Sequence, residues 1–129
     1  MRATIMEIPL LLSQLIDYAA DNHGGTEVVG RGISGGIQRA SYLQLRSRAK
    51  RLAKCLAARG IVTDACVGSL AWNTCDHIEE FYGVLGIGAG LHTINPRLSV
   101  KHLVQMIERV GDQLIFVDAA TIGVAGSIS

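Results

Sequence analysis

The chain has 129 residues, of which 49% are apolar and 18% are charged, and its formal net charge is +1. A chain of this length folds as one domain with a sizeable core, and this composition excludes extensive disorder. The near-neutral charge excludes a general attraction to nucleic acid or to membrane surfaces. Cys55, Cys66 and Cys75 include no Cys-x-x-Cys pair, which predicts reduced, buried thiols in a cytoplasmic protein.

Neither a secretion signal nor a membrane-spanning segment is expected. The apolar run Leu10–Leu12 lies between Glu7 and Asp17, which makes it too short for the apolar core of a signal peptide. No apolar run reaches the roughly 18 residues that a membrane-spanning helix requires.

The chain begins with a predicted helix and a predicted β-hairpin. Apolar residues recur at helical spacing over 10–22, and Pro9 suits the first turn, so this segment is expected to be an amphipathic helix. Short strands are expected at 27–29 and 37–40, and the glycine-rich segment 30–36 is expected to form the turn between them.

A long basic helix is expected over 42–59. Ser41 and Gln44 form a capping box at its start. The segment contains no acidic residue and holds half of the twelve basic residues, namely Arg46, Arg48, Lys50, Arg51, Lys54 and Arg59. This composition is compatible with binding phosphates, acidic lipid or nucleic acid. A solvated face is favoured, because the core needs the apolar stripe of the helix and Tyr42 is its one aromatic residue.

The second half of the chain alternates short apolar strands with helices. Strands are expected at 67–71, 90–94 and 114–117. One helix is capped by Asn73 or Thr74, and the other runs from Ser99 to Gly111. The residues expected to face inward from these helices are Ile78, Phe81, Tyr82, Leu85, Val100, Leu103, Val104, Ile107 and Val110. This βαβαβ order predicts an α/β fold with an incomplete parallel sheet, covered on both faces, while the uncharged tail 119–129 is expected to be irregular.

Two glycine-rich patterns and three histidines resemble parts of functional motifs. In each case the surrounding sequence does not fit the motif. Residues 32–36 fit the G-x-S-x-G nucleophile elbow, but that motif needs a helix after the turn, whereas a second strand follows here. A dinucleotide fingerprint opens a helix after a strand, whereas close helix–sheet packing better explains Gly83, Gly86, Gly88 and Gly90. No metal site is predicted, because no pair among His77, His92 and His102 has i, i+4 spacing with an acidic partner and no cysteine lies in a ligand-like arrangement.

A cleft is expected at one edge of the sheet. Trp72-Asn73 and Asn95-Pro96-Arg97 each follow a strand, and open α/β sheets bind ligands outside the carboxyl ends of their strands. The candidate lining residues are Trp72, Asn73, His92, Asn95 and Arg97. For His92, a structural role with a hydrogen-bonded ring is favoured over a place in the cleft. No catalytic, cofactor-binding or metal-binding role is assigned to any residue.

Three segments together resemble a known family, namely 71–74, 77–82 and 91–98. They are similar to the N-terminal region of adenylate-forming (AMP-binding) acyl-CoA synthetases, and most of all to the medium- and long-chain fatty-acid–CoA ligases. Supporting segments are Pro9–Leu12, Tyr42–Leu45 and 115–118. The resemblance covers about residues 6–118, so 1–118 is identified as part of a large N-terminal AMP-binding domain, from which 119–129 departs.

The resemblance implies an ATP-dependent acid–thiol ligase, which uses Mg-ATP and coenzyme A to convert a carboxylic acid to an acyl-adenylate and then to a thioester. It also implies a phosphate loop and a catalytic lysine, which this sequence does not contain. We therefore expect a fragment that binds none of these cofactors and is inactive alone, because of truncation, a shifted frame or a gene-model artefact. Two alternatives stay open: a non-catalytic dimerisation or interaction module, whose partner is a second copy or the missing remainder of the domain, and a phosphate or anionic-lipid binder through 42–59.

Overall fold

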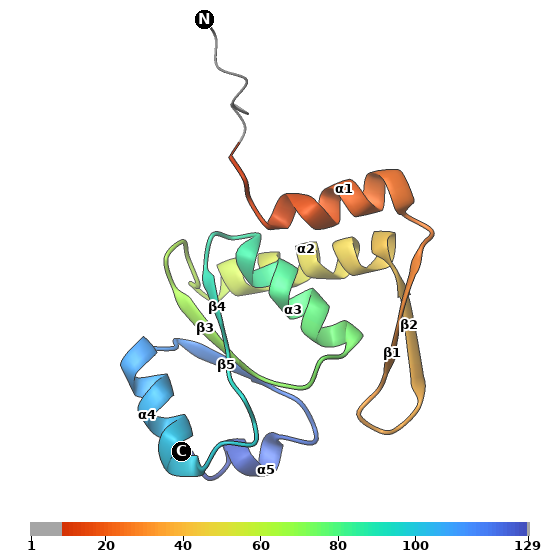
Figure 1. Ribbon diagram of the computed structural model, residues 1–129. Helices are drawn as coiled ribbons and strands as arrows, with labels where there is room; N and C mark the ends of the chain where they lie inside the picture. Colours follow the sequence, from red (N-terminus) through yellow and green to blue (C-terminus); the bar gives the residue numbers. More distant parts are fainter. Residues whose placement is uncertain (1–8, 129) are drawn as a thin grey trace, which may run out of the picture.

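The computed structural model describes residues 9–128, so the first eight residues of the expected domain and Ser129 lie outside the described part. In chain order the described elements are α1 (Ser13–His23), β1 (Glu27–Arg31), β2 (Ile37–Ser41), α2 (Tyr42–Ala58), β3 (Cys66–Leu70), α3 (Cys75–Leu85), β4 (Gly90–Thr93), α4 (Val100–Val110), β5 (Leu114–Val117) and α5 (Ile122–Ala125). β1 and β2 form an antiparallel hairpin, and the other strands form a parallel sheet in the order β4-β3-β5 (Figure 1). The expected βαβαβ arrangement is confirmed.

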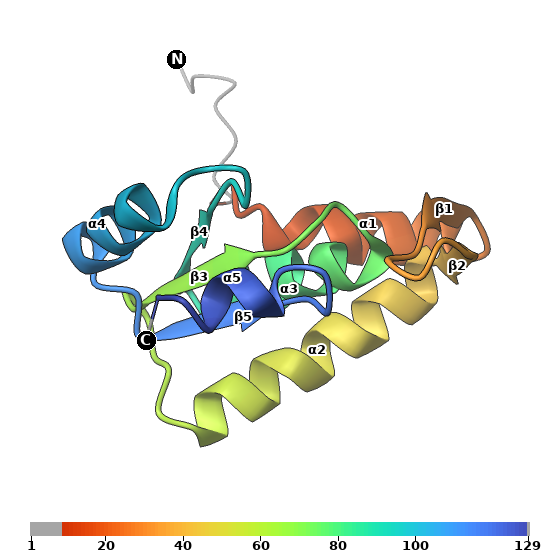
Figure 2. The ribbon, with the colours of Figure 1, turned by 90° about the horizontal axis from the view of Figure 1, so that it is seen from below.

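The parallel sheet is covered on both faces, with α2 and α4 on opposite sides (Figure 2). On one face Val67 packs in a cluster with Leu56 of α2 and Val84 of α3. On the other face Leu70 packs with Leu103 of α4. Successive residues of a strand point to opposite faces, so β3 supplies both cores from alternate positions.

The hairpin and the start of α2 follow the sequence pattern. The amide of Gly32 donates to the carbonyl of Gly36 at 2.7 Å, and Gly35 has a φ of +90°, which a residue with a side chain rarely adopts. A strand follows this turn, so the G-x-S-x-G segment is part of a hairpin. The Ser41 hydroxyl accepts from the Gln44 amide at 3.3 Å, and the Gln44 side chain accepts from the Ser41 amide at 2.9 Å, which is the predicted capping box.

Acidic side chains from neighbouring helices neutralise three of the five cations on α2. Lys50 pairs with Asp17 of α1 at 2.7 Å, and Arg46 pairs with Asp21 of the same helix. Arg48 pairs with Glu79 of α3 at 2.8 Å. This pairing weakens the interpretation of α2 as an anion-binding surface, because fewer free cations remain to attract phosphate.

The inward face of α3 is wider than expected. Two of the expected inward residues, Ile78 and Tyr82, pack against a core cluster. The fully buried residues of the helix, however, are Cys75, Gly83 and Val84. The physical reason is that α3 packs closely on α2, and a large side chain at the contact would hold the two helices apart. A Cβ atom on Gly83 would lie 3.0 Å from the Leu52 side chain and 3.1 Å from the Ala49 carbonyl. The glycine therefore serves helix–helix packing rather than the expected helix–sheet packing.

The expectation of an irregular tail over 119–129 is wrong for residues Ile122–Ala125. Residues Ile122–Ala125 form α5, and Thr121 is buried. Val124, Ala125 and Ile128 pack against the cluster of Leu70 and Leu103. Apolar residues without regular spacing still cover a core when a short turn of helix brings them to its edge.

The three cysteines differ in their surroundings. Cys75 is buried and Cys66 is partly buried, but Cys55 is exposed on α2, so the expectation of three buried thiols is wrong for Cys55. None of them forms a disulfide. Burial raises the pKa of the Cys75 thiol, which keeps it protonated and unreactive at neutral pH. Within 9–128, no helix is both long enough and apolar enough to cross a bilayer.

Replacement of Gly83 by alanine tests the α2–α3 contact. A glycine-to-alanine change inside a helix normally stabilises it by about 1 kcal/mol, but here the methyl group meets a backbone carbonyl. We expect Gly83→Ala to lower the free energy of unfolding by about 1–2 kcal/mol in urea titrations. Gly123→Ala is the matched control, because nothing lies within 4 Å of an added Cβ there. A Gly83→Ala protein as stable as the native one contradicts the close contact.

Candidate functional site

A cleft of about 280 Å³ opens at the carboxyl ends of β3 and β4. Its lining residues are Ser69, Ala71, Trp72, Asn73, His77, Thr93, Ile94, Asn95 and Pro96. Two parallel strands and the loops that leave them form its walls, since Ser69 pairs in register with Thr93 and the Ile94 amide donates to the Ser69 carbonyl at 2.8 Å. This is the expected sheet edge.

The structure places three of the five candidate residues on the wall of this cleft. Trp72, Asn73 and Asn95 lie on its wall. Arg97 lies beyond the wall, with its guanidinium carbon 5.2 Å from the centroid of the Trp72 ring. This cation–π contact joins the loop after β3 to the loop after β4.

The loop 94–98 is held in shape by its own side chains. The Asn95 side-chain oxygen accepts from the Arg97 amide at 3.0 Å, and the Asn95 carbonyl accepts from the Leu98 amide at 3.2 Å. Pro96 between them restricts the backbone further. The loop therefore presents Arg97 with little backbone freedom.

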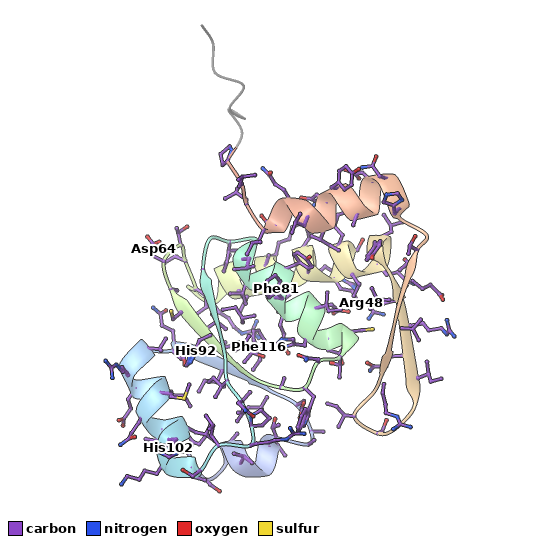
Figure 3. All side chains as sticks on the ribbon, viewed as in Figure 1. Arg48, Asp64, Phe81, His92, His102 and Phe116 are labelled. Carbon is purple, nitrogen blue, oxygen red and sulfur yellow. The ribbon has the colours of Figure 1, made fainter. Side chains whose placement is uncertain are left out.

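The fifth candidate, His92, lies away from the cleft. Its Nδ1 is 2.8 Å from Oδ2 of Asp112, whose side chain is fully buried. A Cβ on Gly68, in the strand between them, would lie 3.2 Å from that same oxygen. Figure 3 shows His92 beside the sheet, near the end of α4 that leads to β5. The favoured interpretation, a structural histidine with a hydrogen-bonded ring, therefore describes His92, and Gly68 makes room for the pair.

A partly buried polar cluster at the wall of the cleft was missed by sequence reasoning. Ser69 is 1% exposed, and its hydroxyl donates to Oε2 of Glu80 at 2.7 Å. Nδ1 of His77 is 3.2 Å from the same hydroxyl and 3.5 Å from the same carboxylate oxygen. The three-residue spacing of His77 and Glu80, beside a serine in an otherwise apolar strand, is the signal that was available.

This cluster differs from a Ser-His-acid catalytic triad. In a triad one imidazole nitrogen faces the serine and the other faces the acid. Here the same nitrogen of His77 faces both partners, and the Ser69 proton is directed to Glu80. The cluster satisfies a buried hydroxyl rather than activating it.

The protein family of this chain follows from a match to a family model. The model of the family described as AMP-binding enzyme matches residues 16–127. The chain belongs to the AMP-binding enzyme family. The match runs past Asp118, where the resemblance was expected to end.

Relatives of this AMP-binding chain are CoA ligases. It is 39% identical to the 3-methylmercaptopropionyl-CoA ligase of Ruegeria pomeroyi, over 92% of this chain and 22% of that protein. It is 33% identical to the medium-chain-fatty-acid–CoA ligase of Ectopseudomonas oleovorans, over the same shares of each. The chain thus spans less than a quarter of the length of these relatives. The resemblance found in the sequence is confirmed at the level of the family.

The fold agrees with this membership. The inhibitor-bound N-terminal domain of FACL13 from Mycobacterium tuberculosis superposes with a TM-score of 0.80 at 23% identity, over 89% of this chain and 28% of that one. This likeness concerns the fold alone. The same arrangement of strands and helices is therefore present in that N-terminal domain.

Within residues 9–128, no strand leads through a glycine-rich turn into a helix. Phosphate loops approach the ligand with the amides of a glycine-rich turn after a strand. Here the loop between β3 and α3 is Ala71-Trp72-Asn73-Thr74, and the glycines Gly86 and Gly88 follow a helix instead. Among residues 9–128, no group of three or more His, Cys, Asp or Glu side chains is placed to hold a metal ion. No phosphoryl step is assigned to these residues.

A double-mutant cycle tests the pair of His92 and Asp112. Each alanine substitution leaves its buried partner without a counterpart, so we expect each to lower the free energy of unfolding by about 3 kcal/mol. The double variant is expected to lose less than the sum, by at least about 1 kcal/mol. Glu27→Ala is the control, because its pair with Arg39 is exposed and contributes less than about 1 kcal/mol. Additive losses in urea titrations would show that the two side chains do not interact.

Proposed function

We propose that this chain is part of an ATP-dependent ligase that joins a carboxylic acid to coenzyme A. The observation that carries the proposal is the 39% identity to a CoA ligase over 92% of the chain. The residues of the sheet edge support it, because the segments around Trp72 and Arg97 that resemble the acyl-CoA synthetases are those that form the cleft.

The substrate is proposed to be an aliphatic acid. Relatives over 90% or more of the chain are a 3-methylmercaptopropionyl-CoA ligase, a medium-chain-fatty-acid–CoA ligase and a long-chain-fatty-acid–CoA ligase. A 4-chlorobenzoate–CoA ligase matches a smaller share, 74%. The three cysteines without disulfides favour a reducing compartment, the cytoplasm, for this ligase.

Within such a ligase the role of this chain is proposed to be shape rather than chemistry. Activation of an acid by ATP depends on cations and amides that stabilise charge on the phosphates. The side chains that line the cleft are mostly uncharged, and the guanidinium of Arg97 is stacked on an indole at its rim. Residues 1–129 by themselves are therefore proposed to bind no nucleotide and to be inactive.

A chimera tests this function. Residues 1–129 replace the matching segment of the Ectopseudomonas oleovorans ligase, and pyrophosphate release is measured with ATP, coenzyme A and acids of increasing chain length. We expect the chimera to retain at least about a tenth of the parent rate, because a segment that shapes the domain is interchangeable within a family.

The 129-residue chain alone is assayed beside the chimera and is expected to show no turnover. An inactive but folded chimera would argue against the ligase function, and turnover by the chain alone would refute its proposed inactivity. Circular dichroism of each protein separates loss of fold from loss of function.

A second function, self-association, is favoured by an apolar groove of about 470 Å³ between α1, α2, α3 and β1. The groove is lined mainly by apolar side chains, namely Leu15, Ile16, Ala19, Val28, Tyr42, Leu45, His77, Ile78, Phe81 and Tyr82. Leu15 and Tyr18 of α1 are more than half exposed. A net charge of +1 does not oppose contact between two copies. We propose a second copy of the chain as the occupant.

Sedimentation over a range of concentrations tests self-association. The native chain is expected to form dimers, and Leu15→Glu is expected to weaken them at least about tenfold by burying a charge at the contact. Val62→Glu is the control, because Val62 is equally exposed but lies outside the groove. A native chain that stays monomeric at all concentrations would eliminate this function.

A further inference from the structure

The carboxylate of Asp118, directly after β5, connects to the loop that carries Trp72. Its Oδ2 accepts the Trp72 amide at 2.8 Å, across 46 residues of sequence. Its Oδ1 accepts the amides of Ala120 and Thr121, both at 2.9 Å. Three amide donors on one carboxylate hold it in a single orientation, so the position of Trp72 depends on the chain after β5.

Thr121 makes the second connection to the same loop. Its side chain is buried, and its hydroxyl donates to the carbonyl of Leu70, the last residue of β3, at 2.6 Å. The same hydroxyl accepts the Asp118 amide at 3.1 Å. The chain leaving β3 is therefore held at the Leu70 carbonyl and at the Trp72 amide, both times by residues after β5.

The held loop in turn supports Arg97. The guanidinium carbon of Arg97 lies 5.2 Å from the centroid of the Trp72 ring, and the Asn95 side chain fixes the backbone of Arg97. A continuous set of contacts thus runs from Asp118 through Trp72 to Arg97, across the mouth of the cleft. Trp72 is 41% exposed, so the packed core alone does not fix its ring.

We propose that Asp118 and Thr121 are positioning residues of the cleft. They hold Trp72 where Arg97 stacks on it, and the indole and the guanidinium then act as one rigid rim. The positioning of Trp72 and Arg97 in this rim does not depend on any assigned reaction. Its effect on acid–CoA ligation rests on the function proposed above.

The first test uses fluorescence, because Trp72 is the sole tryptophan of the chain. In Asp118→Ala and Thr121→Val the loop loses a connection, so we expect acrylamide quenching of Trp72 to rise about twofold, through local opening while far-UV circular dichroism stays native. Thr121→Ser keeps the hydroxyl and is expected to restore native quenching. Arg97→Gln removes only the cation and is expected to change the emission spectrum.

Asp64→Asn is the matched control. Asp64 is exposed on the turn before β3, at the opposite end of the sheet from α5 (Figures 1 and 3), and its side chain is expected to leave Trp72 unaffected. Native quenching in both Asp118→Ala and Thr121→Val would overturn the proposal. If Asp118→Ala fails to fold, the comparison of Thr121→Val with Thr121→Ser decides, and equal quenching in those two overturns it.

The second test places Asp118→Ala in the chimera with the Ectopseudomonas oleovorans ligase. A rim that positions bound ligands rather than reacting atoms predicts a rise in KM of at least about fivefold with a smaller change in kcat. An unchanged KM would overturn the role of Asp118 in positioning ligands at the cleft. If the chimera without the Asp118→Ala substitution is inactive, that result argues against the ligase function. The fluorescence test of the rim does not depend on it.

Discussion

The burial of β3 on both faces is the constraint on which the rest of the structure depends. A buried strand has no face for water, so each residue must match the packing on its own side. Val67 faces the core under α2 and α3, and Leu70 faces the core under α4. Two residues of β3, Gly68 and Ser69, are not large apolar residues, and a neighbouring side chain accounts for each. Gly68 leaves room for Asp112, and Ser69 has the partly buried Glu80 as its partner.

Local rules predicted most of the fold because they act over a few residues. The capping box of Ser41, the left-handed glycine Gly111 at the end of α4 and the strand–helix alternation are all readable within one turn or one element. What failed was decided by packing between distant segments. The buried face of α3 follows from its closeness to α2 at Gly83, and the helix of 122–125 follows from a core that it covers. Neither neighbour is visible in the local pattern.

The position of the candidate site was predictable from the sequence, but the hydrogen bonds that hold its loops were not. Strand ends of a parallel sheet meet at one edge, so Trp72, Asn73 and Asn95 were foreseen together. The side chains that hold them were not, because Asp118 lies 46 residues from Trp72 and bonds to its backbone rather than to its side chain. A hydrogen bond to an amide leaves no mark on the identity of the residue that donates it.

The strand order β4-β3-β5 also has a consequence for how the chain is made. The central strand leaves the ribosome before either of its neighbours, so the sheet grows outward from a strand that waits for both. One helix separates β3 from β4 in the sequence, whereas two helices separate β3 from β5. The entropic cost of closing a loop rises with its length, so pairing with β5 comes later and costs more. During that interval the side of β3 that later pairs with β5 stays open. The nascent chain therefore leaves one edge of its most buried strand unpaired until Leu114–Val117 has emerged.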